Sequence, residues 1–385
     1  MTPPGPARFD DLRAGTGLRF SAPSRVLAAY RPADVVPVLE AVEAATARGK
    51  WAYGFVAYEA AAAYGLDVHL QPPEGLPLVW FGVTDQPQEA ISPTSVGEYD
   101  VHWREHWSRT EYCGLVHRVR EKIAAGETYQ TNLTVRMRGP FFGDPYALYR
   151  DLCSAQRGSC HACLDTGRFV IVSASPELFF ERRGDELLLR PMKGTAPAGP
   201  APSDDRARAR ELRGDEKERA ENIMIVDLMR NDIARVAVPG SVAVPSLLRV
   251  ERYPTVLQLT SEVTARLRPG TGLPDLFAAL FPCGSVTGAP KARTMTLIRE
   301  LENTPRGVYC GAIGWAAPPS APVRSRFGVA IRTAVIDRKA GTAEYGVGGG
   351  ITWGSSADPE HRELLAKARI LRSGEWVARL PVAGG

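Results

Sequence analysis

The spacing of hydrophobic residues switches between two periods along the chain. Apolar side chains recur every three to four residues over 34–47 and 112–125, which predicts amphipathic helices there. Gly126 directly follows the second segment, as is typical of a helix C-terminus. Helices are also expected over 206–232, 292–301 and 359–371.

Other segments alternate apolar and polar residues, which is the period of a β-strand. The alternation is clearest over 130–137, and residues 51–63 are typical of a strand that runs into a helix. Strands are also expected over 168–173, 178–181, 186–190, 311–315, 327–337 and 343–352. Because these strands and helices do not alternate as they do in parallel βαβ units, the pattern favours an α+β fold.

The pattern of hydrophobic residues changes near residues 95–110. Before this point, short apolar runs are interrupted by Pro and Gly, whereas longer regular segments follow it. We expect an N-terminal portion over 1–105 that packs on a catalytic domain over 110–375, followed by a tail over 376–385.

Composition and charge exclude several classes of protein. The 385 residues are 44% hydrophobic and 23% charged, which is typical of a globular chain. With 47 basic and 43 acidic side chains the net charge is +4, so no nucleic-acid partner is expected. No apolar run approaches the roughly 18 residues of a membrane helix, and the first residues lack a signal-peptide core. We therefore expect a cytoplasmic protein with no membrane partner.

The six cysteines are too few for a disulfide scaffold in a chain of this length. Cys160 and Cys163 form a CxxC pair around His161, but no second pair follows at zinc-finger spacing. We expect free thiols rather than a zinc site.

Acidic residues on two expected helices are candidates for a cation site. Glu221 lies where the charged half of 206–232 becomes apolar, and Glu360, Glu363 and Lys367 share one face of the last helix. Spacing alone favours an exposed Glu363–Lys367 pair that stabilises the helix by a few tenths of a kcal/mol, on the order of 0.3. The alternative is that carboxylates from both helices converge on Mg²⁺, which one or two carboxylates and waters typically hold.

Two further features allow a structural or a functional interpretation. The glycine run 346–350 could form either a tight turn or a backbone site for an anion. Lys193 lies beside Gly194 after an expected strand, where a solvated turn lysine is the more frequent case. A desolvated lysine at such a position is instead a nucleophile.

These residues belong to a longer series of motifs that occur in a fixed order. The segments are 126–133 (GETYQTNL), 175–177 (SPE), 190–195 (RPMKGT), 219–232 (RAENIMIVDLMRND), 281–291 (FPCGSVTGAPK), 330–333 (AIRT), 348–351 (GGGI) and 360–367 (EHRELLAK). The series resembles the chorismate-binding domain shared by anthranilate synthase, aminodeoxychorismate synthase and isochorismate synthase. The resemblance covers about residues 110–375 and implies stacked antiparallel β-sheets flanked by helices around one active site.

The resemblance also implies a set of site residues. The metal is Mg²⁺, and the carboxylates matched to it are Glu221, Glu363 and, beside them, Glu360. The substrate chorismate is a dianion, and the groups matched to it are Arg332, Lys367, Thr287, Gly348, Gly349 and Gly350.

Position 193 distinguishes the members of the family, because anthranilate synthases carry alanine there and aminodeoxychorismate synthases carry lysine. The implied mechanism has Lys193 add to C2 of chorismate while Glu177 protonates the departing C4 hydroxyl. Ammonia then adds at C4 and expels the lysine. The product is 4-amino-4-deoxychorismate, a precursor of p-aminobenzoate for folate or secondary metabolism.

The sequence lacks the GxCxG motif of a glutaminase nucleophile, so a separate glutamine amidotransferase subunit is expected to supply ammonia. Anthranilate synthase and 2-amino-2-deoxyisochorismate synthase are the alternative activities, and Lys193 argues against both. A chorismate-binding subunit without activity is the non-enzyme alternative, and the joint presence of Glu177, Lys193, Glu221 and Glu363 argues against it.

The sequence departs from the family at two positions. Gln258 stands where the family often has histidine, and Trp315 stands where it has tyrosine. The tryptophan-binding motif of feedback-inhibited relatives is not recognisable around 21–27, so no inhibition by tryptophan is expected.

Overall fold

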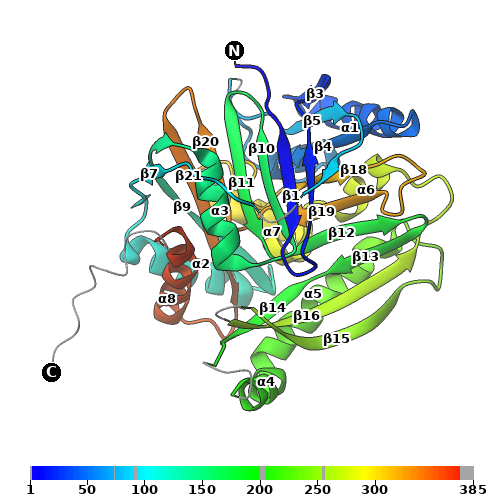
Figure 1. Cartoon of the computed structure of the whole chain (residues 1–385). Coiled ribbons are helices and arrows are strands. Elements are labelled where there is room, and N and C mark those ends of the chain that lie inside the picture. The colour runs from blue at the N-terminus through cyan, green and yellow to red at the C-terminus, as the bar shows by residue number, and fades with distance from the viewer. Residues whose placement is uncertain (1, 73, 91–92, 200–203, 254–255, 373–385) are drawn as a thin grey trace.

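The computed structural model describes residues 2–72, 74–90, 93–199, 204–253 and 256–372, so the expected tail lies outside it. In the described part, the strands form two antiparallel sheets, one of eleven strands and one of ten, flanked by helices (Figure 1). This arrangement confirms the α+β class and the stacked antiparallel sheets.

The larger sheet has the strand order β17-β9-β21-β20-β11-β10-β1-β2-β6, and β7 and β8 pair with β9. Its strands are β1 (Ala7–Asp11), β2 (Thr16–Phe20), β6 (Gln88–Glu89), β7 (Tyr99–Val101), β8 (Arg104–Glu105), β9 (Gln130–Gly143), β10 (Cys160–Asp165), β11 (Phe169–Ser175), β17 (Gly288–Ala289), β20 (Thr333–Asp337) and β21 (Thr342–Thr352).

The smaller sheet has the order β14-β16-β13-β12-β19-β18-β4-β5-β3, and β15 pairs with β16. Its strands are β3 (Arg25–Ala29), β4 (Trp51–Val56), β5 (Val79–Thr84), β12 (Leu178–Arg183), β13 (Glu186–Arg190), β14 (Met192–Pro197), β15 (Ala243–Arg252), β16 (Val256–Arg266), β18 (Ala312–Ala316) and β19 (Ser325–Val329). The N-terminal hundred residues therefore contribute strands to both sheets.

The helices lie around these sheets, and α2 has the clearest start signal. Ser108 and Glu111 form a capping box at the start of α2, which satisfies two free backbone N–H groups. The α-helices are α1 (Pro32–Ala47), α2 (Arg109–Ala124), α3 (Pro145–Gln156), α4 (Asp205–Gly214), α5 (Glu216–Ala234), α6 (Leu273–Leu280), α7 (Lys291–Leu301) and α8 (Ala357–Ala368). Short 3₁₀ segments are η1 (Tyr58–Tyr64), η2 (Gly284–Val286) and η3 (Arg369–Arg372).

The single helix expected over 206–232 is wrong, because the chain forms two helices, α4 and α5. Asp215 separates them with an extended backbone, at φ −64° and ψ 118°. Its side chain accepts a hydrogen bond from the backbone N–H of Glu218 at 2.9 Å and thereby caps α5. The sequence did contain a local signal for this break, because Gly214 directly precedes the capping Asp215, but charged residues on both sides of it gave no change of pattern.

The single strand expected over 327–337 is also wrong. This segment forms two strands, β19 in the smaller sheet and β20 in the larger sheet, so the chain crosses between the sheets here. Arg332 lies at the crossing with a left-handed backbone, at φ +53°. Its strain is retained where the chain must change sheets.

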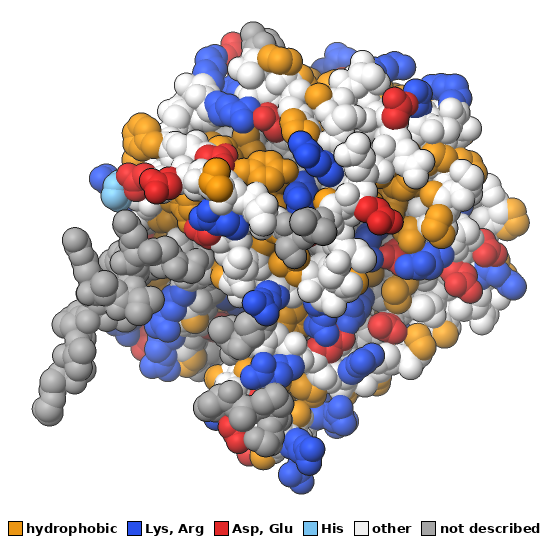
Figure 2. Space-filling view, in the orientation of Figure 1, with side chains coloured by type: hydrophobic (Ala, Val, Ile, Leu, Met, Phe, Trp, Pro, Cys, Tyr) orange, Lys and Arg blue, Asp and Glu red, His pale blue; other side chains and the backbone are white. Residues whose placement is uncertain are grey.

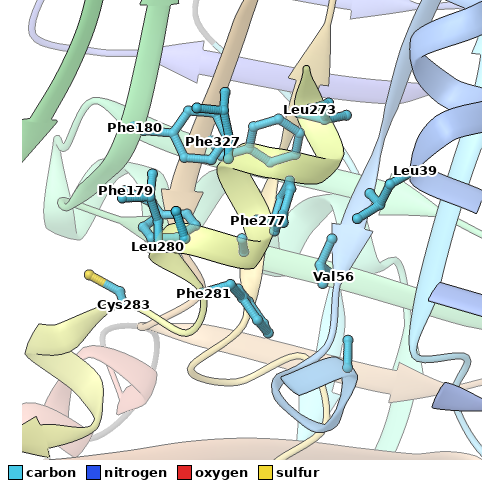
Figure 3. Close-up of a cluster of buried hydrophobic side chains, with 14 of the residues drawn as sticks. Leu39, Val56, Phe179, Phe180, Leu273, Phe277, Leu280, Phe281, Cys283 and Phe327 are labelled. Carbon is cyan, nitrogen blue, oxygen red and sulfur yellow. The ribbon is translucent and has the colours of Figure 1, made fainter. Parts of the chain in front are cut away.

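A cluster of phenylalanine rings fills the core between α6 and the smaller sheet (Figure 3). The ring centroids of Phe277 on α6 and Phe327 on β19 are 5.2 Å apart and the rings are almost perpendicular, at 86°. Phe180 on β12 lies 5.7 Å from Phe277 in a similar edge-to-face contact. Such contacts stabilise aromatic pairs beyond the burial of their area, so they help to hold α6 on the smaller sheet.

The surface carries charges of both signs. On the face shown in Figure 2, Lys and Arg side chains are interspersed with Asp, Glu and apolar side chains. The helices of the described residues include none long and apolar enough to cross a membrane.

Candidate active site

A cavity of about 430 Å³ lies between the two sheets. Strands β9 and β21 of the larger sheet, β14 and β16 of the smaller sheet, and helices α5 and α8 contribute to its wall. The predicted site residues that line it are Lys193, Glu177, Arg332, Lys367, Gly348, Gly349, Gly350, Glu221, Glu360 and Glu363. Residues predicted from separate motifs are therefore brought together.

Lys193 lies in a β-bulge of β14, not in a turn. Strand β14 advances three residues from Met192 to Thr195 while β16 advances two, from Thr260 to Gln258. The extra residue bends the strand and redirects the side chains in it. In the described part of the chain, the Lys193 ammonium makes no hydrogen bond, and it lies 3.0 Å from where a Cβ on Gly350 would be.

Glu177 lies in the turn between β11 and β12 and is only 3% exposed. Burial raises the pKa of its carboxyl to about 7, although the Ser285 hydroxyl and the Lys193 charge oppose that shift. Its Oε1 atom is buried and has no hydrogen-bond partner among the described residues. A carboxyl with this pKa is protonated in roughly half of the molecules at neutral pH, so it can donate a proton there.

The glycine run belongs to strand β21 and is neither a turn nor a loop. Strand β21 pairs with β9 through Thr352, whereas its recorded pairing with β20 ends at Tyr345. The residues from Gly346 to Gly350 line the cavity along this edge. On this edge, Lys367 Nζ donates to the carbonyl of Gly348 at 3.1 Å.

Arg332 and Lys367 add positive charge on the same side. The Nη1 atom of Arg332 lies 3.5 Å from the backbone carbonyl of Lys367. Lys367 Nζ lies 2.8 Å from Oε1 of Glu363, so the pair expected from helical spacing is formed. The Lys367 charge is the main reason that the pKa of Glu363 is lowered from its usual range.

Thr287 is the predicted residue that does not line the cavity. It is fully buried, and its hydroxyl donates to the backbone carbonyls of Cys283 at 3.2 Å and Gly284 at 3.3 Å. Its contact with a substrate stays a prediction.

The acidic residues of α5 and α8 surround a lysine that the sequence analysis did not single out. Lys217 Nζ lies 4.0 Å from Oε1 of Glu221 and 3.8 Å from Oε1 of Glu360. The Ser355 hydroxyl donates to Glu360 at 2.7 Å, while burial raises the pKa of that carboxyl.

Glu218 is a second residue that the sequence analysis missed. It lines the cavity, and burial together with the charge of Glu221 raises the pKa of its carboxyl to about 7. Lys217 and Glu218 precede Glu221 by four and three residues, so helical spacing places all three on one face of α5. That spacing could have identified Lys217 and Glu218 as site residues from the sequence.

The described residues contain no group of three or more His, Cys, Asp or Glu that could hold a metal ion. The donor set nevertheless fits Mg²⁺, which prefers oxygen and needs one or two carboxylates beside water and substrate. Burial is the main cause that raises the pKa of both Glu218 and Glu360, and the charge of Glu363 adds to it, so a cation here would favour the ionised carboxylates.

The two departures from the family lie in different places. Gln258 lines the cavity beside the Lys193 bulge. Trp315 lines another cavity of about 460 Å³, together with Cys160, His161 and Arg326. The change at Trp315 therefore does not alter the wall around Lys193.

Comparison with known proteins decides the family. Residues 84–373, three quarters of the chain, match the family described as chorismate binding enzyme. The chain belongs to this family. Chorismate-binding enzymes act on chorismate, and the cavity accordingly combines cationic side chains with buried polar atoms. One of these, Asn132 Nδ2, has no hydrogen-bond partner in the described ranges.

Relatives within the family carry two different names. Anthranilate synthase component 1 of Streptomyces coelicolor is 40% identical over 288 residues, 74% of this chain and 55% of that protein. Aminodeoxychorismate synthase component 1 of Salmonella typhimurium is 40% identical over 270 residues, 70% of this chain and 58% of that protein. The chain thus spans less than two thirds of these relatives.

A solved structure agrees with the fold. Anthranilate synthase component I from Streptococcus pneumoniae superposes with a TM-score of 0.76 at 28% identity, covering 86% of this chain and 85% of that one. The anthranilate synthase component I-like fold is thereby confirmed.

Proposed function

We propose that this chain is component I of an aminodeoxychorismate synthase, which converts chorismate and ammonia to 4-amino-4-deoxychorismate. The observation that carries the proposal is the position of Lys193, in a bulge at the cavity wall and close to Gly350. An amine held there without a hydrogen bond inside the described chain is available to attack a bound substrate.

In the first step, the neutral amine of Lys193 forms a bond to C2 of chorismate, both conjugated ring double bonds shift by one position, and the C4–O bond breaks. The leaving hydroxyl takes a proton from Glu177 and departs as water, and the lysine nitrogen returns a proton to the Glu177 carboxylate. The pKa of about 7 for the buried Glu177 supports this role, because the carboxyl still holds its proton near neutral pH.

In the second step, ammonia forms a bond to C4, both ring double bonds shift back and the bond between C2 and the lysine nitrogen breaks. The proton that the ammonium group at C4 releases balances the one that the departing lysine nitrogen takes up. Lys193 therefore returns to its initial state, as a catalyst must.

Substrate binding is proposed to use the cationic side of the cavity. Arg332, Lys367 and the open edge of Gly348 to Gly350 are positioned to receive the carboxylates of chorismate. Glu221 and Glu363, with Glu360 beside them, would hold Mg²⁺. The ion would neutralise a substrate carboxylate and hold it in register with Lys193.

A separate glutamine amidotransferase subunit is the proposed source of ammonia. The component 1 names of the relatives support a partner component. In its absence, a high concentration of an ammonium salt would supply the same nucleophile.

Anthranilate synthase is the second candidate, because the Streptomyces coelicolor relative of that name is as similar as the Salmonella typhimurium one. Lys193 favours the first candidate. The deciding experiment incubates the purified chain with chorismate, Mg²⁺ and an ammonium salt and identifies the product by mass spectrometry. Release of fluorescent anthranilate in the absence of any lyase would overturn the proposal.

A further inference from the structure

Gln258 on β16 is hydrogen-bonded to two successive residues of the Lys193 bulge. Its Nε2 atom donates to the backbone carbonyl of Gly194 at 2.7 Å. Its Oε1 atom accepts a hydrogen bond from the hydroxyl of Thr195 at 2.9 Å. One carboxamide thus uses a donor and an acceptor on the segment that directly follows Lys193.

The bulge needs such a partner. A bulge interrupts the ladder of backbone hydrogen bonds, so the carbonyl of Gly194 requires a partner from elsewhere. Gly194 has a left-handed backbone, at φ +91°, and a Cβ there would lie 2.8 Å from Leu259. The conformation is therefore tightly confined by β16 and depends on Gln258 for its hydrogen bond.

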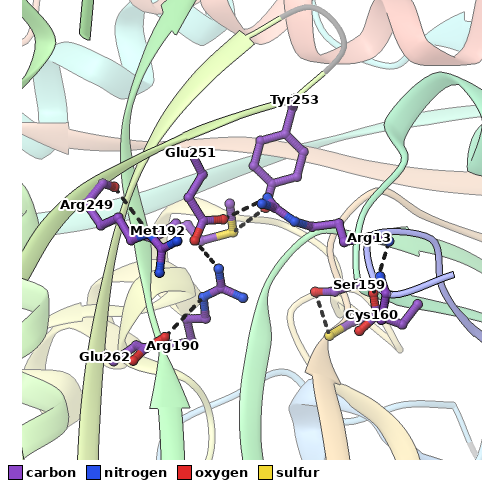
Figure 4. Close-up of polar contacts among 12 residues, drawn as sticks. Arg13, Ser159, Cys160, Arg190, Met192, Arg249, Glu251, Tyr253 and Glu262 are labelled. Carbon is purple, nitrogen blue, oxygen red and sulfur yellow. Dashed lines mark hydrogen bonds and ion pairs between the residues drawn. The ribbon is translucent and has the colours of Figure 1, made fainter. Parts of the chain in front are cut away.

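The backbone that precedes Gly194 is also fixed by hydrogen bonds. The carbonyl of Lys193 accepts from Asn222 Nδ2 at 3.3 Å, and Asn222 Oδ1 accepts from the Ser261 hydroxyl at 2.6 Å. Further back, Arg190 pairs with the buried Glu251 of β15 (Figure 4). The backbone around Lys193 is fixed while its ammonium is left free of hydrogen bonds within the described residues.

The choice of glutamine has a chemical reason. A carboxamide carries its donor and its acceptor on one carbon, so both can reach adjacent groups of one strand. A neutral histidine ring also has one donor and one acceptor, but they sit on separate ring positions and point away from each other. Histidine at this position, which the family often has, is therefore less suited to bond two successive residues of one strand.

We propose that Gln258 is a positioning residue that fixes the bulge and thereby aims the Lys193 amine, without itself contacting the substrate. The inference rests on the proposed function in one respect, namely that Lys193 is the reacting amine.

The test compares Gln258→Ala, Gln258→Glu and Thr195→Val with the wild-type chain. Gln258→Glu keeps the shape but removes the donor to Gly194, and Thr195→Val removes the donor to Gln258. We expect kcat to fall about 10- to 100-fold for the Gln258 variants, since small misplacements of reacting groups have effects of this size. The KM for chorismate should stay within about twofold, because uniform binding is not removed.

A double-mutant cycle measures the coupling between the two residues, which a general loss of stability would not change. Gln258→Ala and Thr195→Val together should cost clearly less than the sum of the two, since they disrupt one bulge. Thr264→Ala, on the same strand beyond the bulge, is the matched control and should behave as wild type. A raised KM with an unchanged kcat, an unchanged kcat, or fully additive effects would overturn the proposal.

Labelling of Lys193 separates this inference from the proposed function. The rate at which Lys193 is acetylated by acetic anhydride without chorismate, read by peptide mass spectrometry, should change by at least about threefold in the Gln258 variants if the amine is re-aimed. An unchanged rate would refute the positioning role even if the product is 4-amino-4-deoxychorismate. Anthranilate as the wild-type product would instead refute the proposed function and leave the labelling result valid. If Gln258→Ala does not fold, as judged by thermal melting, Thr195→Val carries the same test.

Discussion

At the scale of single residues, the environment of Lys193 and Glu177 determines what their functional groups can do. Glu177 is buried and shares the cavity with Lys193, and the lysine charge opposes the rise of its pKa. The two groups therefore interact electrostatically, so a change in the charge of Lys193 changes the pKa of Glu177. Their roles can be tested one at a time.

Lys193→Ala should abolish a covalent adduct. With chorismate and Mg²⁺ but no ammonia, the wild-type chain should gain the mass of chorismate less one water, because the amine replaces the hydroxyl. Intact-protein mass spectrometry measures the gain, and the exposed Lys339→Ala variant serves as the control. Some turnover with ammonia should remain in Lys193→Ala, since metal and substrate positioning persist. An adduct of wild-type size in that variant would exclude Lys193 as the nucleophile.

Glu177→Gln should lower kcat by about 10² to 10⁴-fold with little change in KM, because a proton donor is lost but the shape is kept. The sign of the pH effect follows from the raised pKa: the protonated form is the active acid, so wild-type kcat/KM should fall as pH rises through about 7. The pH profile of the variant should lack this fall. Glu186→Gln, exposed on β13, is the control, and an identical alkaline limb in Glu177→Gln would show that another group titrates.

At the scale of elements, two strands meet across the cavity and leave little room between them. The bulge of β14 directs Lys193 toward the glycine run of β21. The pairing of β20 with β21 ends at Tyr345, before that run begins. A side chain at Gly350 would crowd the amine, since its Cβ would lie 3.0 Å from Lys193 Nζ. The glycines therefore act through the absence of a Cβ.

Gly350→Ala should reduce kcat/KM by at least about tenfold, because its Cβ would lie 2.6 Å from Gln130 Nε2 and 3.0 Å from Lys193 Nζ. Gly354→Ala is the matched control, since a Cβ there meets nothing within 4 Å. Steady-state kinetics and thermal melting would be measured for both variants. Equal kcat/KM values for the two would show that the space near Gly350 is not used.

At the scale of the whole molecule, both sheets and two helices must fold together before the cavity exists. Carboxylates from α5 and α8 approach one another only in the folded chain, and Lys217 is the counter-ion between them. A ligand that binds this arrangement and not the unfolded chain raises the stability of the whole fold.

Mg²⁺ should therefore raise the melting temperature of the wild-type chain, and more so with chorismate present. Glu221→Gln combined with Glu363→Gln should remove most of this increase, because the two proposed metal ligands lose their charge. Scanning calorimetry at several Mg²⁺ concentrations measures it, with the exposed Glu40→Gln as control. The metal assignment would be wrong if the double variant kept the full increase.

The sequence by itself determined the α+β class, several of the helices and strands, and the identity of the motif residues. Periodicity and capping are local properties, so α1, α2 and β13 could be read from them. The ordered motifs also carried the family, because each one is a short contiguous segment.

Only the tertiary structure decided how these segments meet. The break at Asp215 is a local cap that the pattern analysis missed. The sheet crossing at Arg332 depends on packing between distant elements, which a local pattern does not contain. The same holds for the bulge that turns Lys193 from a plausible turn residue into a cavity residue, since its register is fixed by β16. Distances across the cavity arise from strands and helices far apart in the chain, so no spacing in the sequence could supply them.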